Sequence, residues 1–207
     1  GSVLSDIFAL GSQEGEQVNI RNAYNSTDDT YLVNWEDYRH VANEFQPAEI
    51  YGALLDADGN MIVEIPIIDD HGTTEAGDQR VQEVAYNPDR NEFLNIWFDT
   101  RPSLDNGGLV GRIILSDGTP AGPDFVLADS PGNQFTNHIM YVEKKKQYFL
   151  VWEDARDSTN TELPWMLADN MDIYGKWLSQ SGEPIGDDIP ISTVEGRQTT
   201  PKVAYDP

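Results

Sequence analysis

The sequence of 207 residues contains no cysteine. That absence excludes a disulfide framework, thiol catalysis and zinc sites built on thiolates, but it leaves the redox compartment open. No run of about eighteen consecutive apolar residues occurs, so no membrane-spanning helix is expected. The sequence also lacks a glycine-lysine phosphate loop and a Gly-x-Ser-x-Gly nucleophile elbow. The absence of these two motifs excludes the common nucleotide-binding and acyl-transfer sites.

Basic residues are scarce. Thirteen Lys and Arg stand against 36 Asp and Glu, which leaves a formal net charge of -23. Such a charge repels nucleic acid and anionic membranes, so we expect no nucleic-acid partner and no membrane insertion. The acidic residues are spread along the chain, which is typical of a soluble surface that resists association. Cation binding is the alternative interpretation.

A short aromatic motif recurs three times along the chain. Its pattern is aromatic-x3-Trp-x-Asp-x-Arg, and its copies occupy residues 31–39, 93–101 and 148–156. A short strand-like segment ending in Tyr precedes each copy, and two mostly apolar segments joined by a Gly-bearing turn follow it. Glycine between apolar segments is a strong hairpin signal, because glycine accepts a positive φ. Each repeat therefore predicts four antiparallel strands.

We predict a single all-β domain that is β-propeller-like, with about three to three and a half repeats of four-stranded antiparallel blades. The second strands are apolar on both faces, and radially packed blades cover both faces of a sheet. A stacked solenoid or a pair of sandwiches stays open. Because a ring needs roughly four to eight blades, we expect self-association or further blades outside this chain. The full repeats are approximately 18–68, 81–128 and 135–192, with 3–10 and 198–207 as partial flanking repeats.

The last repeat shows its motifs most clearly, as Ile-Tyr-Gly at 173–175, Gly-Glu-Pro-Ile-Gly at 182–186 and Gln-Thr-Thr-Pro-Lys-Val-Ala at 198–204. These motifs resemble a repeat of large secreted and surface-anchored bacterial and archaeal proteins. The resemblance implies a propeller-like fold and an extracellular or cell-surface setting, and it carries no catalytic residues across. The middle copy departs from the pattern, with Phe98 in place of Glu and Val110 in place of Tyr.

The repeated Asp and Arg residues are the first candidate binding residues, together with one loop tryptophan. An Asp at a strand end can accept backbone N–H bonds, and an Arg two residues later can pair with a carboxylate, so a structural role is the preferred interpretation. Alternatively, the three Arg converge on a carboxylate-bearing sugar, as in enzymes that cleave sialic acid, although the Ser-x-Asp-x-Gly-x-Thr-Trp motif of those enzymes is missing. The candidates are Asp37, Arg39, Asp99, Arg101, Asp154, Arg156 and Trp165.

One hairpin turn has the alternating oxygen donors that suit Ca²⁺, which makes Ca²⁺ the one candidate cofactor that the sequence indicates. Its candidate ligands are Asp56, Asp58 and Asn60. The helix-loop-helix calcium motif needs Gly and Glu where this chain has Met61 and Ile67, so an ordinary hairpin turn is favoured. The histidines show no metal-ligand spacing and predict surface or packing residues rather than a zinc site. They are His40, His71 and His138.

Because none of the catalytic motifs considered above occurs, the sequence predicts a non-catalytic extracellular or cell-surface module for recognition, adhesion or assembly. Its loops would bind protein or carbohydrate partners, because exposed loop aromatics often do so. Two alternatives stay open. The first is a structural subunit of a surface layer, sheath or extracellular filament. The second is a secreted glycan-acting hydrolase, whose mark would be carboxylates and an Arg converging on one cleft.

Overall fold

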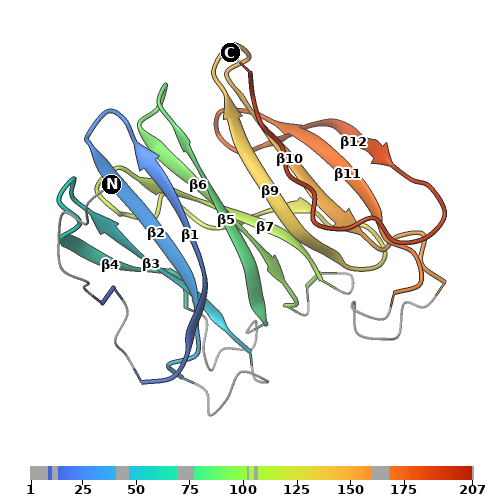
Figure 1. Cartoon of the computed structure of the whole chain (residues 1–207), viewed down its shortest axis with the longest axis horizontal. Helices are drawn as coiled ribbons and strands as arrows, with labels where there is room; N and C mark the ends of the chain where they lie inside the picture. Colours follow the sequence, from blue (N-terminus) through green and yellow to red (C-terminus); the bar gives the residue numbers. More distant parts are fainter. Residues whose placement is uncertain are drawn as a thin grey trace, which may run out of the picture.

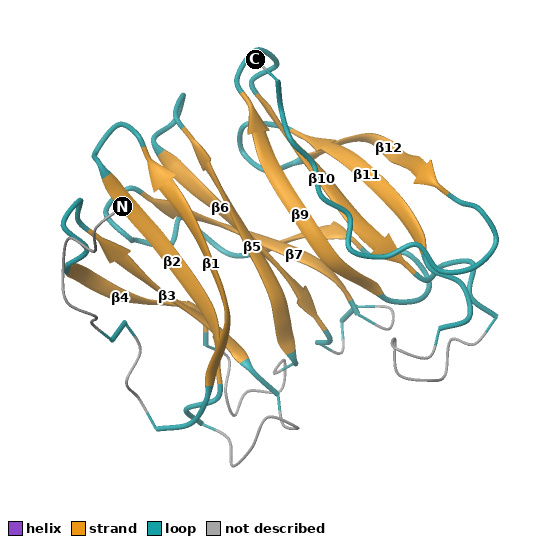
Figure 2. Ribbon diagram, viewed as in Figure 1, coloured by secondary structure: helices purple, strands orange, loops and turns teal. Residues whose placement is uncertain are grey.

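The computed structural model describes residues 9–10, 14–40, 47–69, 77–101, 103–104, 107–159 and 168–206. Within those ranges the chain forms twelve strands and no helix, as Figures 1 and 2 show. The strands make three antiparallel sheets of four strands each. The described part of the chain contains no candidate membrane-spanning helix.

In each sheet the strands lie side by side in the order in which they follow along the chain. The first sheet contains β1 (Gln17–Asn25), β2 (Thr30–Asp37), β3 (Glu49–Leu55) and β4 (Met61–Ile68). The second contains β5 (Gln79–Asn87), β6 (Glu92–Asp99), β7 (Gly108–Leu115) and β8 (Phe125–Ala128). The third contains β9 (Gln134–Val142), β10 (Gln147–Asp154), β11 (Asp172–Leu178) and β12 (Pro184–Ser192).

The three sheets pack against one another through apolar faces. One core lies between the first and second sheets and contains Leu32, Ile65 and Trp97, all nearly or fully buried. A second core lies between the second and third sheets and contains Phe135 and Trp152. The first strands of the sheets, β1, β5 and β9, contact one another in sequence (Figure 1). Consecutive sheets are therefore arranged as neighbouring blades.

Burial differs between the middle sheet and the outer two. Every residue of β6 is buried, whereas β12 is mostly exposed. The exposed large apolar side chains include Tyr24, Met61 and Ile62 of the first sheet and Ile185, Ile189 and Ile191 of the third. A middle blade covered on both faces is what radial packing requires. The predicted all-β, propeller-like class is confirmed, and the extent of the domain stays a prediction.

Glutamates at the end of two second strands connect neighbouring repeats. The backbone N–H of Val81 in β5 donates to Glu36 Oε1 of β2 over 2.8 Å. The N–H of Thr200 donates likewise to Glu153 of β10 over 2.5 Å. In the middle sheet the same position is Phe98, whose ring packs on Phe135 with centroids 4.7 Å apart. An aromatic contact thus takes the place of the carboxylate in the middle copy.

The two partial repeats predicted at the ends stay predictions. The segment 3–10 lies outside the described residues except for residues 9–10. Residues 198–206 do not form the strand that a complete repeat would have there. The N–H of Gln198 donates to the carbonyl of Met171, and the N–H of Val203 donates to His138. A strand needs a ladder partner, and no described strand pairs with residues 198–206.

Candidate functional site

The predicted Asp and Arg residues form the same arrangement in each sheet, which we call the clamp. In the first sheet the Asp37 side chain is fully buried. Trp35 Nε1 donates to it over 2.7 Å, and the backbone N–H of Arg39 donates over 2.9 Å. The Arg39 guanidinium donates to Asp37 over 2.7 Å and to Glu64 of β4 over 2.7 Å. The clamp therefore joins the end of the second strand to the fourth strand.

The other two sheets repeat this geometry. Arg101 donates to Asp124 at 2.7 Å, and Arg156 donates to Asp188 at 2.7 Å, while each also pairs with the Asp two residues before it. In the first and third sheets the guanidinium also lies over a tyrosine ring, at 3.7 Å from Tyr51 and 3.8 Å from Tyr174. These Asp and Arg contacts lie within a single sheet. They support a structural role, and ligand binding by these residues stays a prediction.

Hydrogen bonding keeps the first clamp charged. Burial by itself would raise the pKa of Asp37, but the hydrogen bonds from Arg39 and Trp35 outweigh burial, so its pKa is lowered. The pKa of Arg39 is raised, chiefly by its hydrogen bond to Asp37. Both groups are therefore ionised at neutral pH, and their charges compensate one another.

The predicted calcium ligands lie in the β3–β4 hairpin turn. Asp56 accepts the backbone N–H groups of Asp58 and Asn60 over 3.0 and 2.8 Å, and the Asn60 side chain over 2.9 Å. These contacts close the turn without an ion, which supports the hairpin interpretation. Calcium binding there stays a prediction. Trp165 and His71 lie outside the described residues.

Four side chains that the sequence did not single out as a group meet where the first strands of the sheets and the C-terminal segment lie side by side. Arg21 of β1 donates through Nε to Glu83 Oε1 of β5 over 3.0 Å, and Lys202 Nζ donates to the same oxygen over 3.0 Å. His138 of β9 lies close enough for the charges of all three to affect its pKa. We call Arg21, Glu83, His138 and Lys202 the axial cluster.

The axial cluster combines a shielded carboxylate with accessible cations. The Glu83 side chain is 10% exposed, while those of Arg21 and Lys202 are 37% and 54% exposed. Burial lowers the pKa of His138, and the charge of Lys202 lowers it further against the opposing effect of Glu83. The Val203 N–H donates to Nδ1 of His138 over 3.3 Å, and an Nδ1 that accepts a hydrogen bond belongs to a neutral imidazole. The cluster can therefore accept hydroxyl hydrogens at Glu83 and donate from its two cations.

A repeated local distortion places these side chains in line. Each member follows a glutamine by four residues, and the glutamines are Gln17, Gln79, Gln134 and Gln198. The pairing of β1 and β5 with their neighbours is irregular just before Arg21 and Glu83. Asn19, Val81 and Thr200 adopt positive φ angles of 55°, 53° and 58° at the equivalent positions. A bulge redirects the side chain that follows it. The four glutamines are the sequence signal for the cluster, because an alignment of the repeats on them places its four members at the same position.

A groove of about 460 Å³ lies between β8 and the β11–β12 turn. Phe125 and Pro184 line it together with four charged residues. Three of the four are already in ion pairs, because Arg90 pairs with Glu92 and Asp124 pairs with the clamp arginine. The axial cluster draws its residues from three sheets and the C-terminal segment and leaves both cations accessible, so it is the stronger candidate site.

A scan against protein-family models finds no match, and a search of the curated proteins finds none. Among solved structures the chain is similar to an N-acetylgalactosamine deacetylase from F. plautii, at 13% identity and a TM-score of 0.54, over 88% of this chain and 55% of that one. It is also similar to an α-L-arabinofuranosidase from Fusarium graminearum, at 12% identity and a TM-score of 0.56, over 86% and 49%. An endo-1,4-β-xylanase from Bacteroides thetaiotaomicron gives 11% identity, a TM-score of 0.54, and coverage of 90% and 63%.

These similarities show the propeller fold, and the chain spans about half to three fifths of the solved structures it matches. They contradict two predictions, namely that the chain is a non-catalytic module and that it is not an enzyme, because the matching structures are enzymes that act on glycans. The error has a physical cause. The repeat pattern records the packing of blades, which is the same with or without a catalytic site, so the absence of a catalytic motif carried no information.

Proposed function

We propose that the chain supplies three blades of a glycan-acting propeller enzyme, with the axial cluster at its glycan site. The observation that carries the proposal is Glu83 of β5, a shielded carboxylate held between two accessible cations, Arg21 of β1 and Lys202 of the C-terminal segment. Propellers surround a central channel with their first strands, where a ligand would meet several blades at once. Solved glycan-acting enzymes share this fold.

The chemistry proposed is glycosidic bond cleavage. That reaction uses two carboxylates separated by about 5 to 10 Å, one of which acts on the leaving oxygen and the other on the anomeric carbon or a water. Glu83 is our candidate for one of them, and Arg21 and Lys202 would bind sugar hydroxyls or a sugar carboxylate. The second carboxylate would come from further blades. The resemblance to a secreted repeat also supports an extracellular or cell-surface setting, where polymeric glycans are found.

A panel of aryl glycosides tests this proposal. Wild-type protein is assayed on arabinofuranosides, galactosides and xylosides, and binding of the free sugars is measured by calorimetry. We expect the chain to bind at least one of the sugars and, where self-association or further blades supply the second carboxylate, to turn over the matching glycoside. Glu83→Gln should then lower kcat/KM by about 100-fold or more while far-UV circular dichroism is unchanged. Glu143→Gln, on the exposed β9–β10 turn, is the matched control and should retain full activity.

Two results would contradict the proposal. One is a Glu83→Gln variant as active as the wild type. The other is a wild-type protein that neither turns over nor binds any sugar of the panel at millimolar concentration.

A further inference from the structure

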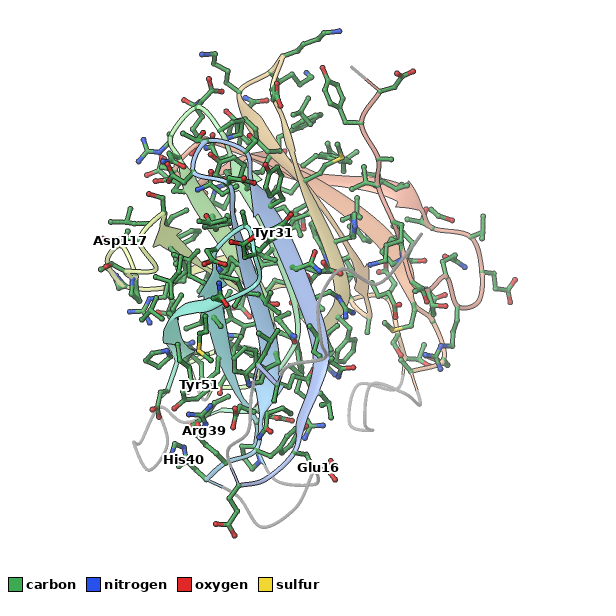
Figure 3. The ribbon with its side chains drawn as sticks, turned by 60° about the vertical axis from the view of Figure 1, so that its left-hand side comes forward. Glu16, Tyr31, Arg39, His40, Tyr51 and Asp117 are labelled. Carbon is green, nitrogen blue, oxygen red and sulfur yellow. The ribbon has the colours of Figure 1, made fainter. Side chains whose placement is uncertain are left out.

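A second group of metal-ligating side chains lies at one end of the first sheet, on strands other than the one that carries Arg21. His40 follows β2, Glu49 begins β3 and Asp69 follows β4. One nitrogen or carboxylate oxygen from each lies within 4.8 Å of the other two. Figure 3 shows His40 beside Arg39 and Tyr51 at this end of the sheet. Three consecutive strands thus bring three donors to one place.

The surrounding contacts hold the donors in position. His40 Nδ1 lies 2.8 Å from Glu49 Oε2. The Tyr51 hydroxyl donates to Asp69 Oδ2 over 2.6 Å. Glu49 is 5% exposed, whereas His40 and Asp69 are open to solvent. An ion can therefore approach the buried carboxylate of Glu49 from the solvent side, past His40 and Asp69.

The third sheet repeats part of this arrangement. Asp172 pairs with Asp154 in the same register as Glu49 pairs with Asp37, and Asp157 follows its clamp arginine as His40 does. Burial and the neighbouring Asp157 raise the pKa of Asp172. Asp172 is 2% exposed, and its Oδ1 has no hydrogen-bond partner among the described residues. An under-satisfied buried carboxylate at the equivalent position favours a cation there too.

We propose that His40, Glu49 and Asp69 bind one divalent transition-metal ion, such as Zn²⁺ or Mn²⁺. One imidazole and two carboxylates suit these ions, whereas Ca²⁺ prefers oxygen ligands alone. Ligand bonds of about 2.0 to 2.2 Å in tetrahedral geometry put donors on a common ion about 3.3 to 3.6 Å apart, so side-chain shifts of about 1 Å complete the site. The ion would connect the ends of β2, β3 and β4, and the site is independent of the proposed glycan chemistry.

Calorimetry on chelator-treated protein tests this site with Zn²⁺, Mn²⁺ and Ca²⁺ as separate titrants. We expect saturable binding of Zn²⁺ or Mn²⁺ that His40→Ala and Asp69→Asn each weaken by at least about tenfold. Glu143→Gln, on the exposed β9–β10 turn, is the control for nonspecific binding to an acidic surface and should leave the affinity unchanged.

Because Asp69→Asn keeps an oxygen for the Tyr51 hydroxyl, this variant tests the site even if His40→Ala does not fold. A thermal melt of the wild-type protein gives a second readout, with the midpoint raised by the bound ion and lowered again by chelator. The proposal is overturned if no transition metal binds saturably, if Asp69→Asn binds as tightly as wild type, or if Ca²⁺ binds more tightly than Zn²⁺ and Mn²⁺.

Discussion

Removal of the third clamp carboxylate, Asp154→Ala, should strongly destabilise the fold. The Asp154 side chain is fully buried. It accepts from Trp152 Nε1 at 2.8 Å, from the backbone N–H of Arg156 at 2.9 Å, and from the Arg156 guanidinium at 2.6 Å. Its loss leaves a buried indole N–H and a backbone N–H without an acceptor. Arg156 keeps Asp188 as a partner, so its charge stays partly compensated.

The magnitude follows from these contacts. Breaking a buried ion pair by removing one partner costs about 3 to 5 kcal/mol, and each unsatisfied buried donor costs about 1 to 3 kcal/mol. Because Arg156 is 20% exposed and keeps its second carboxylate, the low end applies, and the free energy of unfolding should fall by about 3 kcal/mol. With a urea dependence of about 2 kcal/mol per molar, the unfolding midpoint should fall by about 1.5 M.

Urea unfolding followed by circular dichroism and tryptophan fluorescence measures this change. Asp58→Ala, on the exposed hairpin turn, is the control and should stay within about 0.5 kcal/mol of wild type. A double-mutant cycle with Arg156→Ala should give a coupling energy of about 1 to 2 kcal/mol between the two clamp residues. An Asp154→Ala variant within about 0.5 kcal/mol of wild type would refute the structural role of the clamp.

Three further predictions concern a contact between repeats, a tight turn and a partly buried histidine. Glu36→Ala removes the acceptor of the Val81 N–H and should cost about 2 kcal/mol in urea unfolding, and Glu36→Gln, which keeps an oxygen, should cost less. Gly132→Ala should cost about 2 kcal/mol in the same assay, because a Cβ would lie 2.7 Å from the Ala155 carbonyl oxygen at a φ of +85°. The pKa of His138 is lowered in the folded state, so the unfolded chain takes up more protons below about pH 6.5. The free energy of unfolding should therefore decrease as the pH is lowered through this range, and it should decrease less in His138→Gln.

Much of the fold could be predicted from the sequence, because the pattern that identifies a blade is local. The spacing of Trp152, Asp154 and Arg156 places the indole, the carboxylate and the backbone N–H of the arginine within hydrogen-bonding reach inside a few residues. The glycine turns and the two-faced apolar second strands are likewise readable without tertiary contacts. These features specify the strands and the class of fold.

The axial cluster could not be predicted in the same way. Arg21 and Glu83 are 62 residues apart, and Lys202 is 119 residues beyond Glu83. Their meeting depends on how whole sheets pack and on bulges that redirect single side chains, neither of which leaves a local pattern of hydrophobicity. The same limit explains why the sequence assigned no site to these residues, and why His40 was interpreted as a surface or packing residue although Glu49 and Asp69 lie beside it.

The most direct test of the central claim is a crystal structure of the chain soaked with the sugar that the glycoside panel selects. The account predicts the sugar ring at the axial cluster, with hydroxyls in hydrogen-bonding distance of Glu83 and of Arg21 or Lys202. A sugar bound instead in the groove beside Phe125 and Pro184, with the axial cluster unchanged, would contradict it.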